Sequence, residues 1–226
     1  MFWKNKNSSP AYWQAYLSAF SERVVPDTPV DQLRFWVMDT ETTGLNPRQD
    51  ELLSLAGIPM KNYTLSISGS YECLLTQKQP PGRDSIPIHG ILPDTQQQSC
   101  GFEMVLPDLL KRINNRIIVG HHIRFDIQML NKAIKAITGD HLKNDLLDTA
   151  DLARRLPPFR ENKPDKGLSL DELCQFYGIK QHGRHTAAGD TFLTAYILCA
   201  QLKALEKQGV SSRKDLFRKP LKIHRY

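Results

Sequence analysis

The sequence predicts one α/β domain built on a mixed β-sheet flanked by helices. Three strand-like apolar runs come first, and helical patterns then alternate with short apolar runs. Consecutive strands favour antiparallel pairing and strand–helix–strand units favour parallel pairing, so the order predicts both in one sheet. The 226 residues are 40% apolar and 24% charged, which is enough for a buried core and unlike a disordered chain.

Residues 1–30 are expected to form a helical extension ahead of this domain. Ser9 and Pro10 are typical of a helix start. Residues 11–20 then carry aromatic and apolar side chains at helical spacing. Such a stripe favours packing on the main domain over a ligand site. Pro26 and Pro29 separate the extension from the first strand.

The main domain is predicted at residues 31–209. Each strand run is apolar and bounded by turn residues, and each helix run repeats its apolar residues every three or four positions. The predicted strands are 33–38, 51–58, 63–75, 116–120 and 146–148, and the predicted helices are 102–113, 125–137, 168–177 and 187–208. A loop rich in Pro, Gln, Gly and Asp is expected at 76–97.

Charge is unevenly distributed along the chain. The formal net charge is +6, and residues 201–226 hold eight basic and two acidic side chains, so residues 1–200 are balanced. We therefore predict a basic C-terminal tail at 210–226, which either contacts phosphate backbones or is a solvated surface. The loop at 154–166 is also basic and proline-rich, and it either guides a nucleic-acid strand or only connects two elements.

Other features of the composition indicate a cytoplasmic protein without a membrane partner. No run approaches about 18 consecutive apolar residues, and the N-terminus lacks the apolar core of a secretory signal. The four cysteines form no CxxC pair, which favours free thiols in a reducing compartment.

Two carboxylates follow the first predicted strand. Asp39 and Glu41 are two residues apart, and residues at this spacing share one face of a strand. Two neighbouring buried carboxylates need a compensating cation, and Mg²⁺ or Mn²⁺ suits oxygen ligands. The alternative is a strand-end turn with an exposed acid.

Two further acids and a histidine lie at helix starts. Asp126 is expected in the first turn of its helix, where an acid is also favourable for dipole reasons alone. Asp190 lies near the start of the long, mainly apolar helix, so it calls for a partner such as a metal shared with Asp39 and Glu41. His185, five residues earlier, is either a proton acceptor at neutral pH or a helix-capping residue.

These residues also carry a family resemblance. The sequences VMDTETTGL at 37–45, VGHHIRFD at 119–126 and HTAAGD at 185–190 resemble the three motifs of the DnaQ-like DEDDh 3′→5′ exonucleases, in that order. The third has the histidine form, HxAxxD. The resemblance covers residues 33–205. Within the family, the motifs most resemble those of the epsilon proofreading subunit of bacterial DNA polymerase III. His122 departs from it, because relatives commonly have Asn there.

The resemblance implies a ribonuclease H-like fold and hydrolysis with two ions of Mg²⁺ or Mn²⁺. Asp39 would contact both ions, Glu41 and Asp190 would complete one site, and Asp126 would serve the other. His185 would be the general base. The backbone near Thr42 would hold the terminal 3′-hydroxyl, Leu45 would contact the terminal bases, and His122 would donate a hydrogen bond in place of the usual Asn.

The predicted function is removal of nucleoside 5′-monophosphates from the 3′ end of single-stranded DNA, in proofreading or repair. One alternative is an exoribonuclease or short-oligonucleotide nuclease on the same scaffold. Another is a non-catalytic module that binds nucleic acid or a polymerase. A DNA polymerase or sliding clamp is a further candidate partner, since residues 213–217 resemble the end of a clamp-binding peptide but lack its leading Gln.

Overall fold

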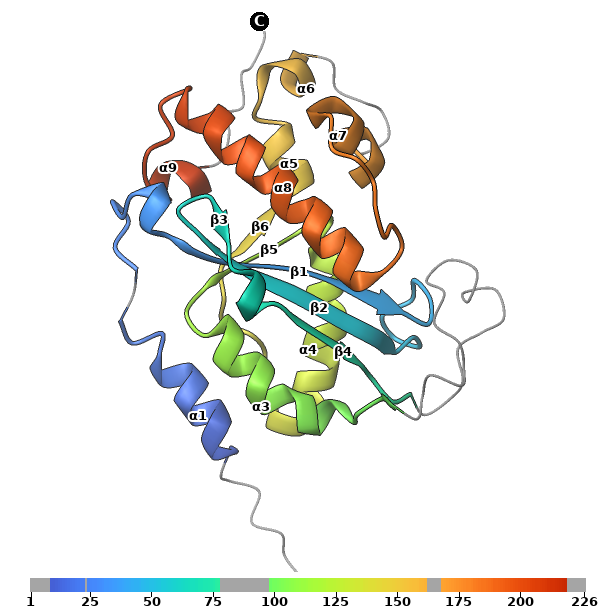
Figure 1. The fold of residues 1–226 in the computed structure, drawn as a ribbon. Coiled ribbons are helices and arrows are strands. Elements are labelled where there is room, and N and C mark those ends of the chain that lie inside the picture. Colours follow the sequence, from blue (N-terminus) through green and yellow to red (C-terminus); the bar gives the residue numbers. More distant parts are fainter. Residues whose placement is uncertain (1–8, 23, 78–97, 162–167, 219–226) are drawn as a thin grey trace, which may run out of the picture.

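The computed structural model describes residues 9–22, 24–77, 98–161 and 168–218, and these form a mixed sheet between two layers of helices (Figure 1). Within this part of the chain the six-stranded sheet has the order β3-β2-β1-β5-β6, with β4 also paired to β2. The strands are β1 (Arg34–Thr42), β2 (Leu52–Lys61), β3 (Thr64–Leu65), β4 (Tyr71–Leu74), β5 (Ile117–Gly120) and β6 (Leu146–Asp148). The mixed sheet expected from the sequence is therefore confirmed.

The central strand β1 pairs with one neighbour in antiparallel and with the other in parallel orientation. It runs antiparallel to β2, from Arg34 opposite Lys61 to Thr42 opposite Leu52, and parallel to β5. β5 in turn runs parallel to β6. The expected third strand, 63–75, is instead two short strands separated by a 3₁₀ turn at Ile67–Gly69. The Ser-Gly-Ser sequence at 68–70 lies at this interruption.

Alternate residues of β1 enter different cores because successive side chains of a strand point to opposite faces. Phe35 and Val37 pack with residues of the long helix α8 (Ala187–Glu206), whereas Trp36 and Met38 pack with residues of α3 (Phe102–Ile113) and α4 (Arg124–Thr138). Figure 1 shows α8 on one side of the sheet and α3 and α4 on the other. This alternation decides which helix each carboxylate of β1 faces.

The remaining helices are short and lie around this framework. They are the 3₁₀ turn Val30–Gln32, α5 (Thr149–Ala153), α6 (Pro157–Glu161), α7 (Leu170–Tyr177) and α9 (Arg213–Phe217). Part of the expected 154–166 loop is therefore helical. The predicted loop residues 78–97, loop residues 162–166 and tail residues 219–226 lie outside the described ranges. No helix among the described residues has both the length and the apolar character needed to cross a membrane.

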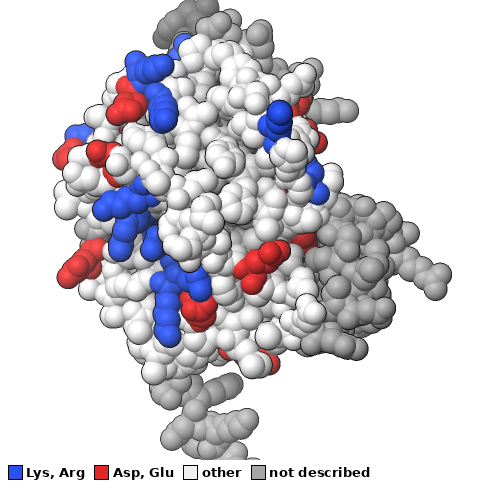
Figure 2. Space-filling view, in the orientation of Figure 1, with Lys and Arg blue, Asp and Glu red and all other residues white. Residues whose placement is uncertain are grey.

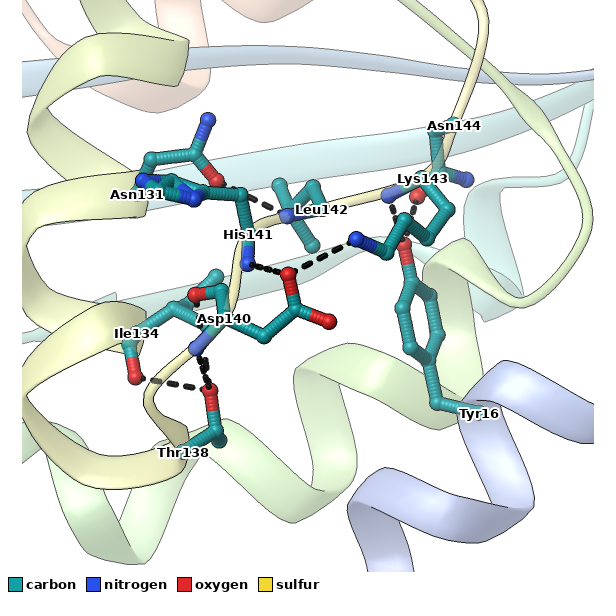
Figure 3. Close-up of polar contacts among 9 residues, drawn as sticks. All are labelled: Tyr16, Asn131, Ile134, Thr138, Asp140, His141, Leu142, Lys143 and Asn144. Atoms are coloured by element: carbon teal, nitrogen blue, oxygen red, sulfur yellow. Dashed lines mark hydrogen bonds and ion pairs between the residues drawn. The ribbon is translucent and has the colours of Figure 1, made fainter. Parts of the chain in front are cut away.

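The N-terminal helix α1 (Ala11–Ser18) packs on the domain, as its aromatic stripe predicts. Trp13 and Tyr16 are buried in the same core as α3 and α4. The Tyr16 hydroxyl donates to Oδ1 of Asn144 at 2.5 Å and accepts from the backbone N–H of Lys143 at 2.8 Å (Figure 3). Asn144 lies in the segment that joins α4 to β6, so α1 is fastened to the start of a sheet strand.

The segment 210–218, expected as the first half of a basic tail, is instead part of the folded unit. Leu216 of α9 is only 1% exposed and lies in the α8-side core. The backbone of Ser212 bridges Pro29, and the Arg155 guanidinium donates to the carbonyls of Asp215 and Leu216. Because this segment is rich in basic residues, its composition suggested a tail. The buried side chain of Leu216 nevertheless holds it on the core.

Candidate active site

Asp39 and Glu41 lie on the α8-facing side of β1, near its carboxyl end. Asp190, in the first turn of α8, meets them there. Each of the three offers a carboxylate oxygen, and these oxygens all lie within 4.8 Å of one another. The spacing of two along the strand therefore places both carboxylates where the sequence predicted, next to the acid of the last long helix.

Asp126 approaches from the opposite face of the sheet, on α4. It is 6% exposed, and its Oδ1 accepts from the backbone N–H of Thr40 at 3.1 Å and from the Thr40 hydroxyl at 2.6 Å. Thr40 lies between Asp39 and Glu41, so its side chain points away from theirs and toward α4. Asp126 is therefore held beside β1, outside the set of three close oxygens.

The cluster carries strong electrostatic repulsion. Burial raises the pKa of Asp39 well above its usual range, and the charges of Asp126, Asp190 and Glu41 raise it further. Burial and Asp190 raise the pKa of Glu41 to about 7. Burial also raises the pKa of Asp126 to about 7, although the hydrogen bonds from Thr40 oppose the shift. Such an arrangement favours the binding of cations.

Arg184 is a site residue that the sequence analysis did not identify. Its guanidinium is ion-paired with Oδ2 of Asp190 and with Oδ1 of Asp171, the latter at 2.6 Å. Although burial lowers the pKa of Arg184, the hydrogen bonds to these two carboxylates raise it overall. The other oxygen of Asp190, Oδ1, is buried and has no hydrogen-bond partner among the described residues. The positive charge of Arg184 therefore compensates the negative charge of the acid cluster only in part.

His185 lies just before α8, next to the acid cluster in sequence and exposed to solvent. Thr186, and not His185, is the N-cap of α8, because its side chain accepts from the backbone N–H of Gly189. His185 has a φ of 62°, a left-handed conformation that non-glycine residues adopt only when the surrounding structure holds them there. The helix-capping alternative for His185 is therefore wrong.

The loop before α8 is packed tightly against the helix. A Cβ at Gly189 would lie 1.8 Å from the carbonyl oxygen of Gly183, so only glycine fits at this position. The Thr186 hydroxyl also donates to the Gly183 carbonyl at 2.7 Å. These contacts hold the segment that carries Arg184 and His185 in one place.

The turn after β1 presents an apolar side chain to solvent. Leu45 is 86% exposed, the most exposed large apolar residue of the described chain. Its turn is nevertheless well held: Asp50 accepts from the Thr43 hydroxyl at 2.9 Å and from the Asn46 N–H at 2.7 Å, and the Lys132 ammonium donates to the Asp50 carbonyl. The Thr42 hydroxyl donates to the Gly44 carbonyl. Thr42 itself is the last residue of β1.

His122 occupies a position with a φ of 56°. Asn and His are both enriched in this conformation, which accounts for His at a position where related motifs carry Asn. Its ring contacts that of His121, whose Nδ1 is 2.9 Å from the Thr149 hydroxyl. No side-chain hydrogen bond of His122 is found within the described residues, so the expected donor role stays a prediction.

The domain that bears these residues matches a known family. The sequence profile described as Exonuclease aligns with residues 36–198, most of the chain. The chain belongs to the exonuclease family. The match begins in β1, before the Asp39–Glu41 pair, and ends within α8, beyond Asp190, so the exonuclease domain contains every residue of the acid cluster.

Two of the relatives carry the name of DNA polymerase III. The chain is 28% identical over 207 residues to a PolC-type DNA polymerase III of Thermotoga petrophila, and 30% identical over 194 residues to a DNA polymerase III subunit epsilon-like protein of Rhodobacter capsulatus. These alignments cover 90% and 84% of this chain, but only 15% and 27% of the relatives. The exonuclease domain therefore corresponds to a minor part of each longer protein.

Solved structures share the fold. Exonuclease I of E. coli in complex with a dT13 oligonucleotide superposes with a TM-score of 0.65 at 19% identity, covering 79% of this chain and 43% of that one. The cell-death related nuclease 4 superposes with a TM-score of 0.59 at 14% identity, covering 76% and 64%. The ribonuclease H-like arrangement expected from the motifs is thus confirmed.

The residues present fit divalent cations. Carboxylate oxygens are the ligands that Mg²⁺ and Mn²⁺ prefer. Asp39, Glu41 and Asp190 bring such oxygens together, and the buried Oδ1 of Asp190 lacks any other partner in the described structure. Thr40 orients Asp126 through its hydrogen bonds, and Arg184 orients Asp190 through an ion pair. Thr40 could have been found from its place between two acids, whereas nothing in the sequence marks Arg184.

Proposed function

We propose that the chain is a metal-dependent 3′→5′ exonuclease that hydrolyses the 3′-terminal phosphodiester bond of single-stranded DNA. The observation that carries the proposal is the set of three carboxylate oxygens within 4.8 Å, inside the exonuclease domain. The polymerase names of the relatives and the oligonucleotide bound in the E. coli Exonuclease I structure support DNA as the substrate.

Asp39, Glu41 and Asp190 would hold one cation, and Asp39 with Asp126 would hold a second. Two such cations, when bound, stabilise the charge on the attacking and leaving oxygens of a phosphoryl displacement. Arg184 keeps Asp190 oriented from one side, and Thr40 keeps Asp126 oriented from the other. The chain thus supplies a preorganised set of ligands whose mutual repulsion is relieved by cations.

His185 would accept a proton from the attacking water. In the reaction, water oxygen bonds to phosphorus and the bond from phosphorus to the 3′-oxygen of the penultimate nucleotide breaks. The shortened strand keeps a 3′-hydroxyl, protonated from solvent, and the released nucleotide keeps its phosphate as a 5′-monophosphate. The exposed position of His185 allows proton exchange with solvent after each turnover.

The Thr42 backbone and Leu45 would locate the end of the strand. Leu45 is apolar, exposed and carried on a turn fixed by Asp50 and Lys132, so it offers a stable contact for a terminal base. Such a contact accepts any base, as a degrading enzyme requires. His122 stays a candidate substrate contact.

The test uses 5′-labelled single-stranded DNA and RNA of the same sequence with Mg²⁺, Mn²⁺ or excess EDTA. We expect a DNA ladder that shortens from the 3′ end, mononucleotide products, and no cleavage in EDTA. Asp190→Asn serves as the inactive variant. Faster degradation of RNA would favour the exoribonuclease alternative, and a folded chain that cleaves neither substrate would favour the non-catalytic module.

A polymerase stays a proposed partner, on the names of the relatives. The structure removes the argument for a sliding clamp from residues 213–217. Leu216 is buried in the core and Phe217 packs against it, so this segment cannot act as an extended peptide without leaving the fold.

A further inference from the structure

A polar cleft lies far from the acid cluster, where the end of α1, the end of α3 and the starts of β1 and β5 meet. Its volume is about 410 Å³. Arg34 begins β1, and Asp39 lies five residues farther along the same strand, which is about 17 Å at 3.3 Å per residue. The cleft is therefore a separate feature from the proposed catalytic centre.

Among the described residues that line this cleft, positive charges outnumber negative ones. Arg34, Lys111 and Arg116 line it, and none of them forms an ion pair with a described residue. The neighbouring Arg112 differs, because it is paired with Asp108 at 2.9 Å. In Figure 2 several basic side chains lie along the left of the molecule, with acidic side chains between them.

The acidic lining is limited to Glu22, so three cationic side chains and one carboxylate leave two positive charges. Burial lowers the pKa of Arg116, and the nearby Arg34 lowers it further. The half-buried Arg116 thus lies near the exposed Arg34, and neither forms an ion pair within the described chain, an arrangement that a bound anion would relieve.

The walls of the cleft are fixed by hydrogen bonds. The Asn144 side-chain amide donates to the carbonyls of Ile113 and Arg116, both at 2.7 Å, while its oxygen receives the Tyr16 hydroxyl (Figure 3). The Asn115 amide donates to the Glu22 carbonyl at 3.2 Å. The end of α1 is thus joined to the α3–β5 turn, and the cleft exists only because the N-terminal extension is docked.

We propose that this cleft binds a phosphomonoester dianion, either free phosphate or the phosphate of a nucleotide or nucleic-acid end. Its two unbalanced positive charges match the charge of such a group. Guanidinium and ammonium groups are the side chains that recognise phosphate oxygens most effectively. A monoanionic phosphodiester within a strand would leave part of the positive charge uncompensated.

The test measures binding of inorganic phosphate, thymidine 5′-monophosphate and thymidine to the full chain in EDTA, by calorimetry and by amide chemical shifts. We expect the two phosphates to bind, thymidine not to bind, and the Asn114 and Asn115 amides to shift. The double variant Arg34→Gln/Lys111→Gln should weaken binding at least about tenfold. Both side chains are exposed, so the fold should persist, and melting curves check this.

The matched control is Lys135→Gln/Lys207→Gln, which removes the same charge from exposed positions elsewhere. Equal phosphate affinity of the two double variants would overturn the proposal, as would the absence of phosphate binding. A 5′-phosphorylated dT12 and its 5′-hydroxyl form separate the sources: preference for the phosphorylated form indicates a nucleic-acid end. Equal binding of both oligonucleotides, lost in the cleft variant, would indicate backbone recognition and overturn the proposal. Hydrolysis at the acid cluster is measured separately, so the two proposals fail independently.

Discussion

Replacing Asp126 by Asn should make the metal-free protein more stable while it abolishes hydrolysis. Asn has nearly the same shape, and its side-chain oxygen can still accept from the Thr40 N–H and hydroxyl, which lie 3.1 and 2.6 Å from Asp126 Oδ1. The substitution therefore removes a buried charge and keeps the contacts. Any gain in stability reports the cost of that charge.

The magnitude follows from the pKa of Asp126, which burial raises from 3.8 to about 7. Because the folded-state pKa is the higher one, the charge costs nothing below pH 3.8, and the cost grows as pH rises and is complete above pH 7. At about 1.4 kcal/mol per pH unit, it reaches up to about 4 kcal/mol at pH 8 and about 2 kcal/mol at pH 5. The Asn variant should gain these amounts.

The assay is urea unfolding in EDTA at pH 8 and pH 5, repeated at pH 8 with Mn²⁺. Glu72→Gln is the control, because it removes an exposed carboxylate of β4. With Mn²⁺ the advantage of Asp126→Asn should shrink, since the cation stabilises the wild-type chain more. A variant no more stable than wild type at pH 8 in EDTA, with an unchanged m-value, would refute the reasoning.

Three further substitutions probe the other contacts. Tyr16→Phe removes the hydroxyl bonded to Asn144 and should cost about 1–3 kcal/mol, because it leaves buried polar groups unpaired; a melting temperature equal to that of wild type would contradict this. His185→Asn suits the positive φ and should lower turnover about 10²–10⁴-fold without changing the melting curve. Full turnover at pH 7 would exclude His185 as the base. Gly189→Ala should reduce both activity and melting temperature, because its Cβ would clash with the Gly183 carbonyl. Wild-type values for both would show that the loop before α8 can move to accommodate the added methyl group.

The basic C-terminal segment shows how composition misleads. Residues 210–226 were expected as a tail, yet α9 is docked through Leu216 and through hydrogen bonds to Arg155. A deletion from residue 211 would remove part of the core and confuse folding with nucleic-acid binding. Truncation after Arg218 leaves α9 intact and tests the residues beyond it for a role in binding.

The sequence by itself determined the order of the elements and the pairing of Asp39 with Glu41, because both depend on local periodicity. A strand returns to the same face every second residue wherever it lies in a fold. The resemblance in three motifs added Asp126, His185 and Asp190, but it did not indicate how their side chains are held.

Only the tertiary structure decided which helix covers which face of the sheet, and hence the details of the site. Thr40 bonds Asp126 across 86 residues of sequence, and Arg184 joins Asp190 to Asp171 of another helix. The basic cleft likewise requires α1 to dock beside the end of α3. Such contacts depend on long-range packing, which no local pattern encodes, because the same amphipathic helix can pack on either face of a sheet that is apolar on both.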